Sequence, residues 1–213
     1  MISGDLDAAF VDGGHVALEL LTRGEVEERW DRASVLDRMS VGMLACHLGR
    51  QLVRAEEILS VPADDDPLAE ADEHYRRAAW VTASDLDDPA HDRSLDEAEA
   101  ALGMAAMLRR ATSALDAVEG LLDRSAAAAV VAIPWQGWSL RRPDFLLTRI
   151  VELVTHTDDL ARSIDVPTPS FPPGTYRPAL HLLARLAAER HGQAALTSAL
   201  TRSERMPSTI SAF

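Results

Sequence analysis

Four polar residues with spacings suited to metal chemistry, Arg149, Glu152, His156 and Asp159, lie three or four positions apart. At 3.6 residues per turn, this spacing places all four side chains on one face of a helix. Apolar residues flank that face, so we expect the four groups to border the interior, where ionised groups are costly unless they are paired or bind a metal. Glu152 and His156, at positions i and i+4, can reach one divalent ion. A solvated helix face is the alternative interpretation.

A metal site needs a third ligand, and the best candidate is His47 in the amphipathic segment SVGMLACHLGRQLVRAEEIL. His47 lies at the margin of the apolar face of that segment. A histidine in such a position more often packs in the core than binds a metal. Two helices that face each other would instead bring His47 to Glu152 and His156.

The elements that must position these residues are predicted to be four long helices. The first covers about 5–28, the second begins after the N-cap residue Ser40 and ends near residue 59, and the third covers about 94–124. The fourth has Pro143 in its first turn. An acidic, proline-containing connection with one short helix around 69–81 separates the second and third helices, and the Ala/Val run before the fourth could be a short strand.

The proline-rich segment VPTPSFPPGTYRP follows the fourth helix. Beyond it we expect a helix that ends at Gly192, a second short helix, and a strand or tail at 206–213. The predicted fold class is all-α. Residues 1–166 should form a metal-binding four-helix bundle with a long crossover connection, and residues 167–213 a small helical appendage packed on it.

Composition excludes several classes of function. The formal net charge of −13, from 34 acidic and 21 basic residues, disfavours nucleic acids and anionic membranes as partners. The sequence contains no lysine, which excludes a Schiff-base lysine and the lysine of a nucleotide-binding P-loop. Neither a G-x-S-x-G nor a G-x-G-x-x-G motif is present.

The single cysteine, Cys46, excludes an internal disulfide and fits a reducing cytoplasm. We expect Cys46 to be a small buried residue, so any thiol chemistry would use an external thiol. The first residues lack the pattern of a secretory leader, and no segment approaches 18 uncharged apolar residues. These features predict a soluble cytoplasmic protein, either a monomer or a homodimer.

Several segments together resemble the mycothiol-dependent maleylpyruvate isomerase family of the DinB-like superfamily. They are WDRASVLDRMSVGMLACHL, which begins at Trp30, the motif PWQGWSL, the pattern R-x-x-E-x-x-x-H-x-x-D-L from Arg149 onward, and the C-terminal LLARLAAERHGQAALTSALTRSERMPSTISAF. The resemblance covers most of the chain and implies a DinB-like four-helix bundle. It also implies a metal triad of His47, Glu152 and His156.

The resemblance further implies a metal-dependent thiol S-transferase or isomerase that uses mycothiol on a small electrophile. Two histidines and one carboxylate are typical of catalytic zinc sites, although nickel or iron could also bind. A coordinated thiol loses its proton, and the thiolate is the nucleophile. The alternative functions are a non-catalytic metal-binding or small-molecule-binding bundle and a protein whose triad only stabilises its fold.

Four further residues are candidates for the site. Arg149 is predicted either to bind a substrate carboxylate or phosphate or to pair with an acid such as Asp159. Asp159 is predicted to orient His156 or to be the partner of Arg149. Trp135 and Trp138 could wall the site and hold the thiol cofactor, or could pack in the core. The remaining tryptophans and histidines, Trp30, Trp80, His15, His74, His91, His181 and His191, are expected to be packed or solvated.

Overall fold

The computed structural model describes residues 6–83 and 87–213. Within these ranges the chain is mostly helical, as predicted, and contains one small antiparallel sheet. The elements are α1 (Leu6–Leu21), α2 (Gly24–Glu28), α3 (Val41–Leu59), α4 (Ala71–Arg77), α5 (Ala79–Thr82), α6 (Ser94–Ala100), α7 (Met104–Asp123), β1 (Val130–Ile133), β2 (Trp138–Arg141), α8 (Arg142–Ser163), α9 (Pro173–His191) and α10 (Gln193–Thr201), with short 3-10 turns at Pro89–His91 and Ser203–Arg205.

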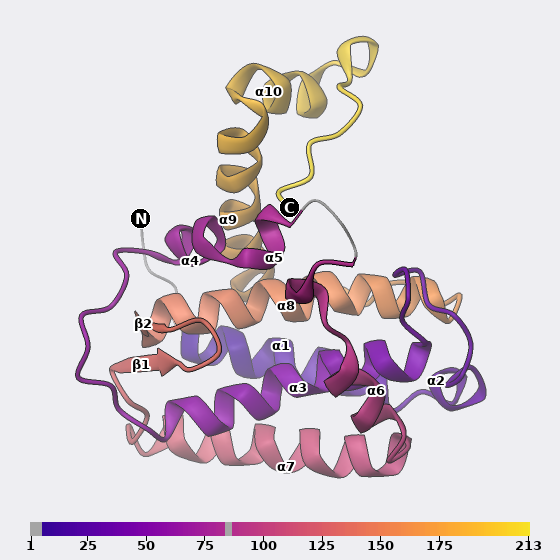
Figure 1. Ribbon diagram of the computed structural model, residues 1–213, viewed down its shortest axis with the longest axis vertical. Coiled ribbons are helices and arrows are strands. Elements are labelled where there is room, and N and C mark those ends of the chain that lie inside the picture. Colours follow the sequence, from indigo (N-terminus) through magenta and orange to yellow (C-terminus); the bar gives the residue numbers. More distant parts are fainter. Residues whose placement is uncertain (1–5, 84–86) are drawn as a thin grey trace.

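Four of the long helices, α1, α3, α7 and α8, pack side by side and enclose the hydrophobic core (Figure 1). Each contributes large apolar side chains with almost no exposed surface, among them Phe10 of α1, Leu48 of α3, Leu115 of α7 and Leu153 of α8. Since apolar burial is the main favourable term in folding, this packing sets the faces that α3 and α8 turn toward each other.

The predicted second helix agrees with α3, and the Ser40 side chain caps it by accepting a hydrogen bond from the Met43 N–H (3.1 Å). The predicted first helix is interrupted after Leu21 and continues as α2. The predicted third helix is likewise two helices, α6 and α7, because Gly103 between them has a φ of +83° that no helix interior allows. The change of direction at Gly103 lets α6 pack on α3.

The hairpin β1–β2 leads directly into α8, with Val131 paired to Leu140 and Ile133 to Trp138. The Ala/Val run was predicted as a strand and forms β1, whereas the partner strand β2 was not predicted. The turn between the strands contains Trp135 and Gly137. The φ of Gly137 is +78°, a conformation that favours glycine. The hairpin therefore carries the tryptophan motif to the start of the helix that bears Glu152 and His156.

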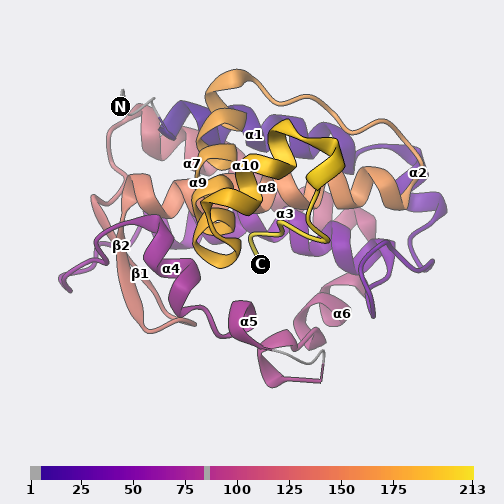
Figure 2. The same cartoon turned by 90° about the horizontal axis from the view of Figure 1, so that it is seen from above.

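The C-terminal region leaves the four-helix core along α9, which rises from the bundle in Figure 1 and is seen nearly end-on in Figure 2. Ala179, Leu182 and Leu186 on α9 belong to the same hydrophobic core, whereas no residue of α10 is buried. The final residues form a tail without strand pairing that returns toward α4 and α5, where the Phe213 ring stacks on Tyr75. None of the described helices combines the length and apolarity needed to cross a bilayer.

The close approach of Trp30 to α3 leads to a stability prediction. A Cβ added at Gly42 would lie 2.5 Å from Cε2 of the Trp30 indole, whose Nε1 donates to the Ala100 carbonyl (3.1 Å). Gly42→Ala must therefore move a rigid, anchored ring and is expected to lower the free energy of unfolding by about 1–3 kcal/mol in urea denaturation. The control is Gly24→Ala, where a Cβ would meet nothing within 4 Å. Equal stability of the two variants would contradict the prediction.

Candidate metal centre

His47 on α3 and both Glu152 and His156 on α8 converge on one point. One ligand atom from each residue lies within 4.8 Å of the other two. The Nε2 atom of His156 is 3.3 Å from Oε2 of Glu152, and the Nε2 atom of His47 is 3.8 Å from that same oxygen. The helices run in opposite directions and face each other (Figure 1), which is the arrangement needed to bring His47 to the other two residues.

The spacing of the three ligand atoms suits a divalent ion. Zinc bonds of about 2.0–2.2 Å in a tetrahedron place neighbouring ligand atoms about 3.3–3.6 Å apart. The two distances to Glu152, 3.3 and 3.8 Å, are close to this range, and all three pairs lie within 4.8 Å. Three protein ligands also leave a position for a further ligand, as catalytic zinc sites do. His47, Glu152 and His156 could therefore hold a metal ion.

Each imidazole is oriented by a carboxylate on its other ring nitrogen. Nδ1 of His47 is 3.2 Å from Oδ1 of Asp96, and Nδ1 of His156 is 3.0 Å from Oδ2 of Asp159. When Nδ1–H donates to a carboxylate, the neutral ring presents the lone pair of Nε2 to a metal. Both histidines thus have the partner that metal-binding histidines commonly have.

Asp96, the partner of His47, is itself fixed by a buried arginine. Nη2 of Arg50 lies 2.9 Å from Oδ1 of Asp96 and 2.6 Å from Oε2 of Glu99. Burial alone would raise the pKa of Asp96, but hydrogen bonds from His47 and Arg50 lower it below the ordinary value. The carboxylate beside His47 therefore stays charged.

The same balance between burial and hydrogen bonding controls the ionisation of Glu152 and His156. Burial alone would raise the pKa of Glu152, but the neighbouring His156 and His47 imidazoles hold it well below its ordinary value. Burial alone would lower the pKa of His156, but Asp159 and Glu152 raise it to about 9. In the metal-free protein Glu152 is an anion and His156 a cation, so a metal ion must displace a proton to bind.

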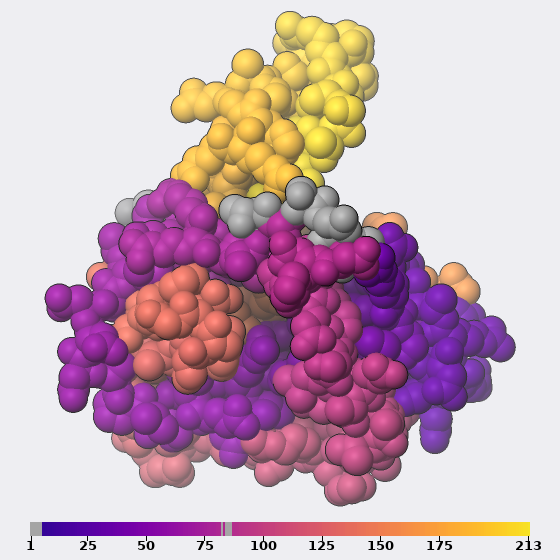
Figure 3. Space-filling model, viewed as in Figure 1, coloured from indigo at the N-terminus to yellow at the C-terminus, as the bar shows by residue number. Residues whose placement is uncertain are grey.

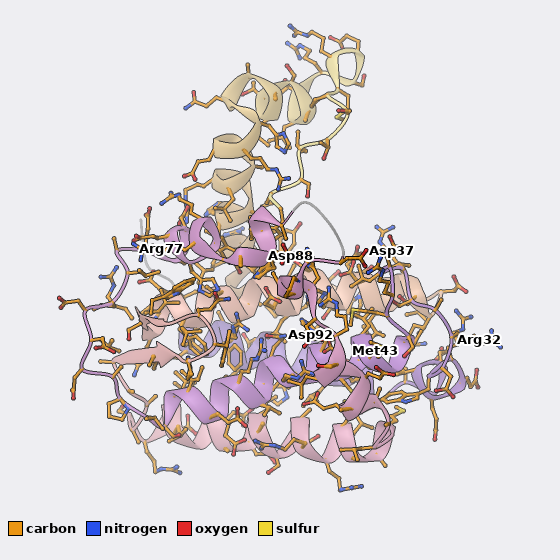
Figure 4. All side chains as sticks on the ribbon, viewed as in Figure 1. Arg32, Asp37, Met43, Arg77, Asp88 and Asp92 are labelled. Atoms are coloured by element: carbon orange, nitrogen blue, oxygen red, sulfur yellow. The ribbon has the colours of Figure 1, made fainter. Side chains whose placement is uncertain are left out.

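The three residues lie in the wall of a cavity of about 540 Å³. Figure 3 shows the surface hollowed between the β1–β2 hairpin and the segment that leads into α6. Trp135 and Gln136 of the hairpin turn line one side, and the segment from Ala90 to Asp96, apart from Ser94, lines another. In Figure 4 the labelled Asp88 and Asp92 mark the path of this segment across α8 toward α3. The volume suits a small-molecule ligand.

The four further candidates are placed as follows. Arg149 lines the cavity, and its Nη1 donates to Oε1 of Gln51 (2.5 Å), so its predicted pairing with Asp159 is not formed. Asp159 lies behind His156 and acts as its orienting partner. Trp135 lines the cavity, whereas Trp138 is not part of that wall and donates from Nε1 to Nδ1 of His74 (3.2 Å).

Sequence reasoning missed three residues of the site. Asp96 was not among the candidates, and its contact with His47 depends on the chain reversal before α7. His74 was expected to be either solvated or packed. It is packed and buried, and its ring also lines the cavity. Arg54 was not singled out, although its position seven residues after His47 places it on the same face of α3.

Cys46 adjoins His47 in sequence but has a different role in the structure. Its side chain is buried, and burial raises the pKa of the thiol to about 12. Such a thiol is protonated near neutral pH and is a poor nucleophile. The burial of Cys46 agrees with the expectation from the sequence, and this thiol is not a candidate nucleophile.

Comparisons of the chain with protein-family models, with curated proteins and with solved structures found no match. The function is therefore inferred from the sequence motifs and from the geometry of the site. That geometry combines a possible metal triad, two orienting carboxylates and a cavity with arginines in its wall.

Proposed function

We propose that the protein is a metal-dependent thiol S-transferase or isomerase that uses mycothiol, built on a four-helix bundle of the DinB-like, maleylpyruvate isomerase type. The observation that best supports this proposal is the position of His47, Glu152 and His156 in the wall of a cavity large enough for a thiol and a small electrophile. A site that only stabilised the fold would need no such access.

Each part of the site has a distinct role in this proposal. A divalent ion, zinc by preference, would favour the thiolate form of a bound thiol. Asp96 and Asp159 hold the two imidazoles so that each Nε2 faces the ion. Because the Cys46 thiol is buried and protonated, the nucleophile in this proposal is an external low-molecular-weight thiol, and the family resemblance implies mycothiol.

The reaction forms a bond between the thiol sulfur and an electrophilic carbon of the substrate, and the thiol proton is released. In a transfer reaction the thioether is the product and any leaving group departs with its electron pair. In an isomerisation the adduct first rotates about the neighbouring carbon–carbon bond. The same carbon–sulfur bond then breaks, and the thiol is recovered. Arg149, which lines the cavity, holds an anionic group of the substrate in either case.

Cobalt(II) substitution tests the proposal, because thiolate coordination to cobalt adds a sulfur-to-metal charge-transfer absorption. We expect mycothiol to produce this absorption in the cobalt-loaded protein, whereas the analogue with a hydroxyl in place of the thiol should not. The His156→Ala variant should show no thiol-dependent change. Cobalt binding without any response to mycothiol or to simpler thiols would contradict the proposal and favour a non-catalytic metal-binding bundle.

A further inference from the structure

His74 of α4 is a histidine of the cavity wall that does not belong to the triad. The residue is only 3 % exposed, and its ring is packed between two aromatic neighbours. The ring centroid lies 5.2 Å from that of Tyr75 and 5.7 Å from that of Trp138, with both pairs nearly perpendicular. These contacts hold the imidazole in one orientation at the edge of the cavity.

The hydrogen bond from Trp138 fixes which ring nitrogen of His74 carries the proton. Nε1 of Trp138 lies 3.2 Å from Nδ1 of His74, and an indole N–H can only donate. Nδ1 is therefore the acceptor, and the proton of the neutral ring is on Nε2. Nε2 has no acceptor among the residues described, and it is not one of the polar atoms sealed inside the protein. Since the ring lines the cavity, the Nε2–H group is available to a ligand there.

His74 is uncharged under ordinary conditions. Burial, together with the nearby charge of Arg149, lowers its pKa to about 4, and the opposing effect of Glu152 is smaller. A neutral imidazole can donate a hydrogen bond to an oxygen that becomes negative and still keep its own proton. His74 is thus a preorganised neutral donor, with its tautomer set by Trp138.

The packing of α4 on α8 places His74 close to the triad. The hydroxyl of Tyr75 donates to the carbonyl oxygen of Thr148 (3.3 Å), and Thr148 lies about one helical turn before Glu152 on α8. His74, which adjoins Tyr75, therefore lies over the part of α8 that leads into the triad. His74 and the three possible metal ligands line the same cavity from different elements.

We propose that His74 is a catalytic residue whose Nε2–H donates to the substrate oxygen that gains negative charge when the thiolate attacks. This inference rests on the function proposed above and assigns a role to a residue that the proposal does not use. A donor held in place before the reaction stabilises such an oxygen without any rearrangement of the site. Trp138 acts through His74 and is by this inference a positioning residue.

The role of His74 can be followed for an electrophilic carbon that is conjugated to a carbonyl group. The sulfur bonds to that carbon, and the electrons of the carbon–carbon double bond move onto the carbonyl oxygen, which accepts the hydrogen bond from His74. In a transfer, water then supplies a proton to the carbon between them. In an isomerisation, the electrons return after rotation and the thiolate departs. His74 keeps its proton throughout.

The tautomer of His74 can be measured in the metal-free protein, without any catalytic assay. Long-range ¹H–¹⁵N correlation spectra distinguish the two neutral tautomers and the charged ring, and the His74→Gln variant identifies the signals of His74. We expect the Nε2–H tautomer without titration from about pH 6 to about pH 8. Trp138→Phe should yield a mixture of tautomers, because nothing then donates to Nδ1. A charged ring at neutral pH, or a proton on Nδ1 in the unmodified protein, would overturn the proposal.

Two electrophiles test the catalytic role in the zinc-loaded protein with mycothiol. Methyl vinyl ketone places negative charge on its oxygen when sulfur attacks, whereas allyl bromide has no oxygen and loses bromide. His74→Phe should slow the ketone reaction about 10- to 100-fold more than the bromide reaction, the range for a hydrogen bond to a charged group. His74→Gln, whose amide can donate, should restore part of the ketone rate. The matched control Tyr75→Phe removes a hydroxyl from the neighbouring buried ring of α4.

The outcomes separate the role of His74 from the proposed function. Equal slowing of both reactions by His74→Phe would show a structural role and overturn the proposal, as would a selective loss of the same size in Tyr75→Phe. If neither reaction is accelerated by a protein whose cobalt form responds to mycothiol, the role of His74 is rejected and the thiol-binding centre stands. If the cobalt form does not respond either, both proposals fail.

Discussion

Replacing His156 by alanine is expected to lower the affinity for zinc by more than about 100-fold and to leave the helical structure intact. The reason is that His156 supplies one of only three protein ligands, and even a change of a residue that merely orients a ligand costs about 10- to 100-fold. The fold should survive because His156 lies in the cavity wall and the packed core of α1, α3, α7 and α8 does not include it.

The measurement is competition for zinc with a chelator of known affinity, combined with circular dichroism. The matched control is His181→Ala, which removes an exposed histidine of α9 outside the cavity. We expect about one zinc ion per chain in the unmodified protein and in the control. The same zinc affinity in His156→Ala as in the unmodified protein would show that the triad is not the binding site.

A smaller loss is expected for Asp159→Asn in the same competition assay. Asp159 does not belong to the triad, but it accepts a hydrogen bond from Nδ1 of His156 at 3.0 Å and thereby orients the ring. The affinity for zinc should fall by about 10- to 100-fold. A loss as large as that of His156→Ala would mean that Asp159 is itself a ligand, and no loss would mean that the ring needs no orientation.

The second large effect is expected in the metal-free protein, which should become less stable as pH rises from about 6.5 to about 9. The pKa of His156 is raised from its ordinary value of 6.5 to about 9. Its contribution to stability is therefore complete below pH 6.5 and is lost as pH rises toward 9. At 1.36 kcal/mol per pKa unit, the loss in the free energy of unfolding is about 3 kcal/mol.

Glu152 does not change this expectation, because its lowered pKa makes a contribution that is present above pH 4.5 and constant across the window. Urea denaturation of chelator-treated protein near pH 6 and near pH 9 measures the effect. The His156→Gln variant lacks the titrating group and corrects for other ionisations, including that of Cys46 in the unfolded chain. Identical pH dependence in the two proteins would contradict the assigned role of His156.

Local patterns in the sequence were sufficient to predict the elements that carry the site. Ser40 caps α3 and Pro143 lies in the first turn of α8, as expected. These features depend on neighbouring residues only, because a cap or a helical face is set within one or two turns of backbone. For the same reason Glu152 and His156, four residues apart, could be recognised as a pair that reaches one ion.

The breaks in the predicted first and third helices could not be inferred from apolar spacing alone. The helical pattern continues through Gly103, yet this residue adopts a positive φ, and α6 turns back onto α3. A glycine permits such a reversal but does not require it. The packing of α6 against α3 selects it, and only then does Asp96 reach His47.

By itself, the sequence determined the two helices that carry the site and the residue types on their faces, including the three possible metal ligands. The tertiary structure decided which charges are compensated. Asp96 joins His47 from 49 positions away, Trp138 sets the tautomer of His74 from 64 positions away, and Arg54 is left beside Arg149 with no carboxylate partner in the described residues. Spacing along one helix is encoded locally, whereas the neighbours of a buried charge are known only when every face that packs around it is known.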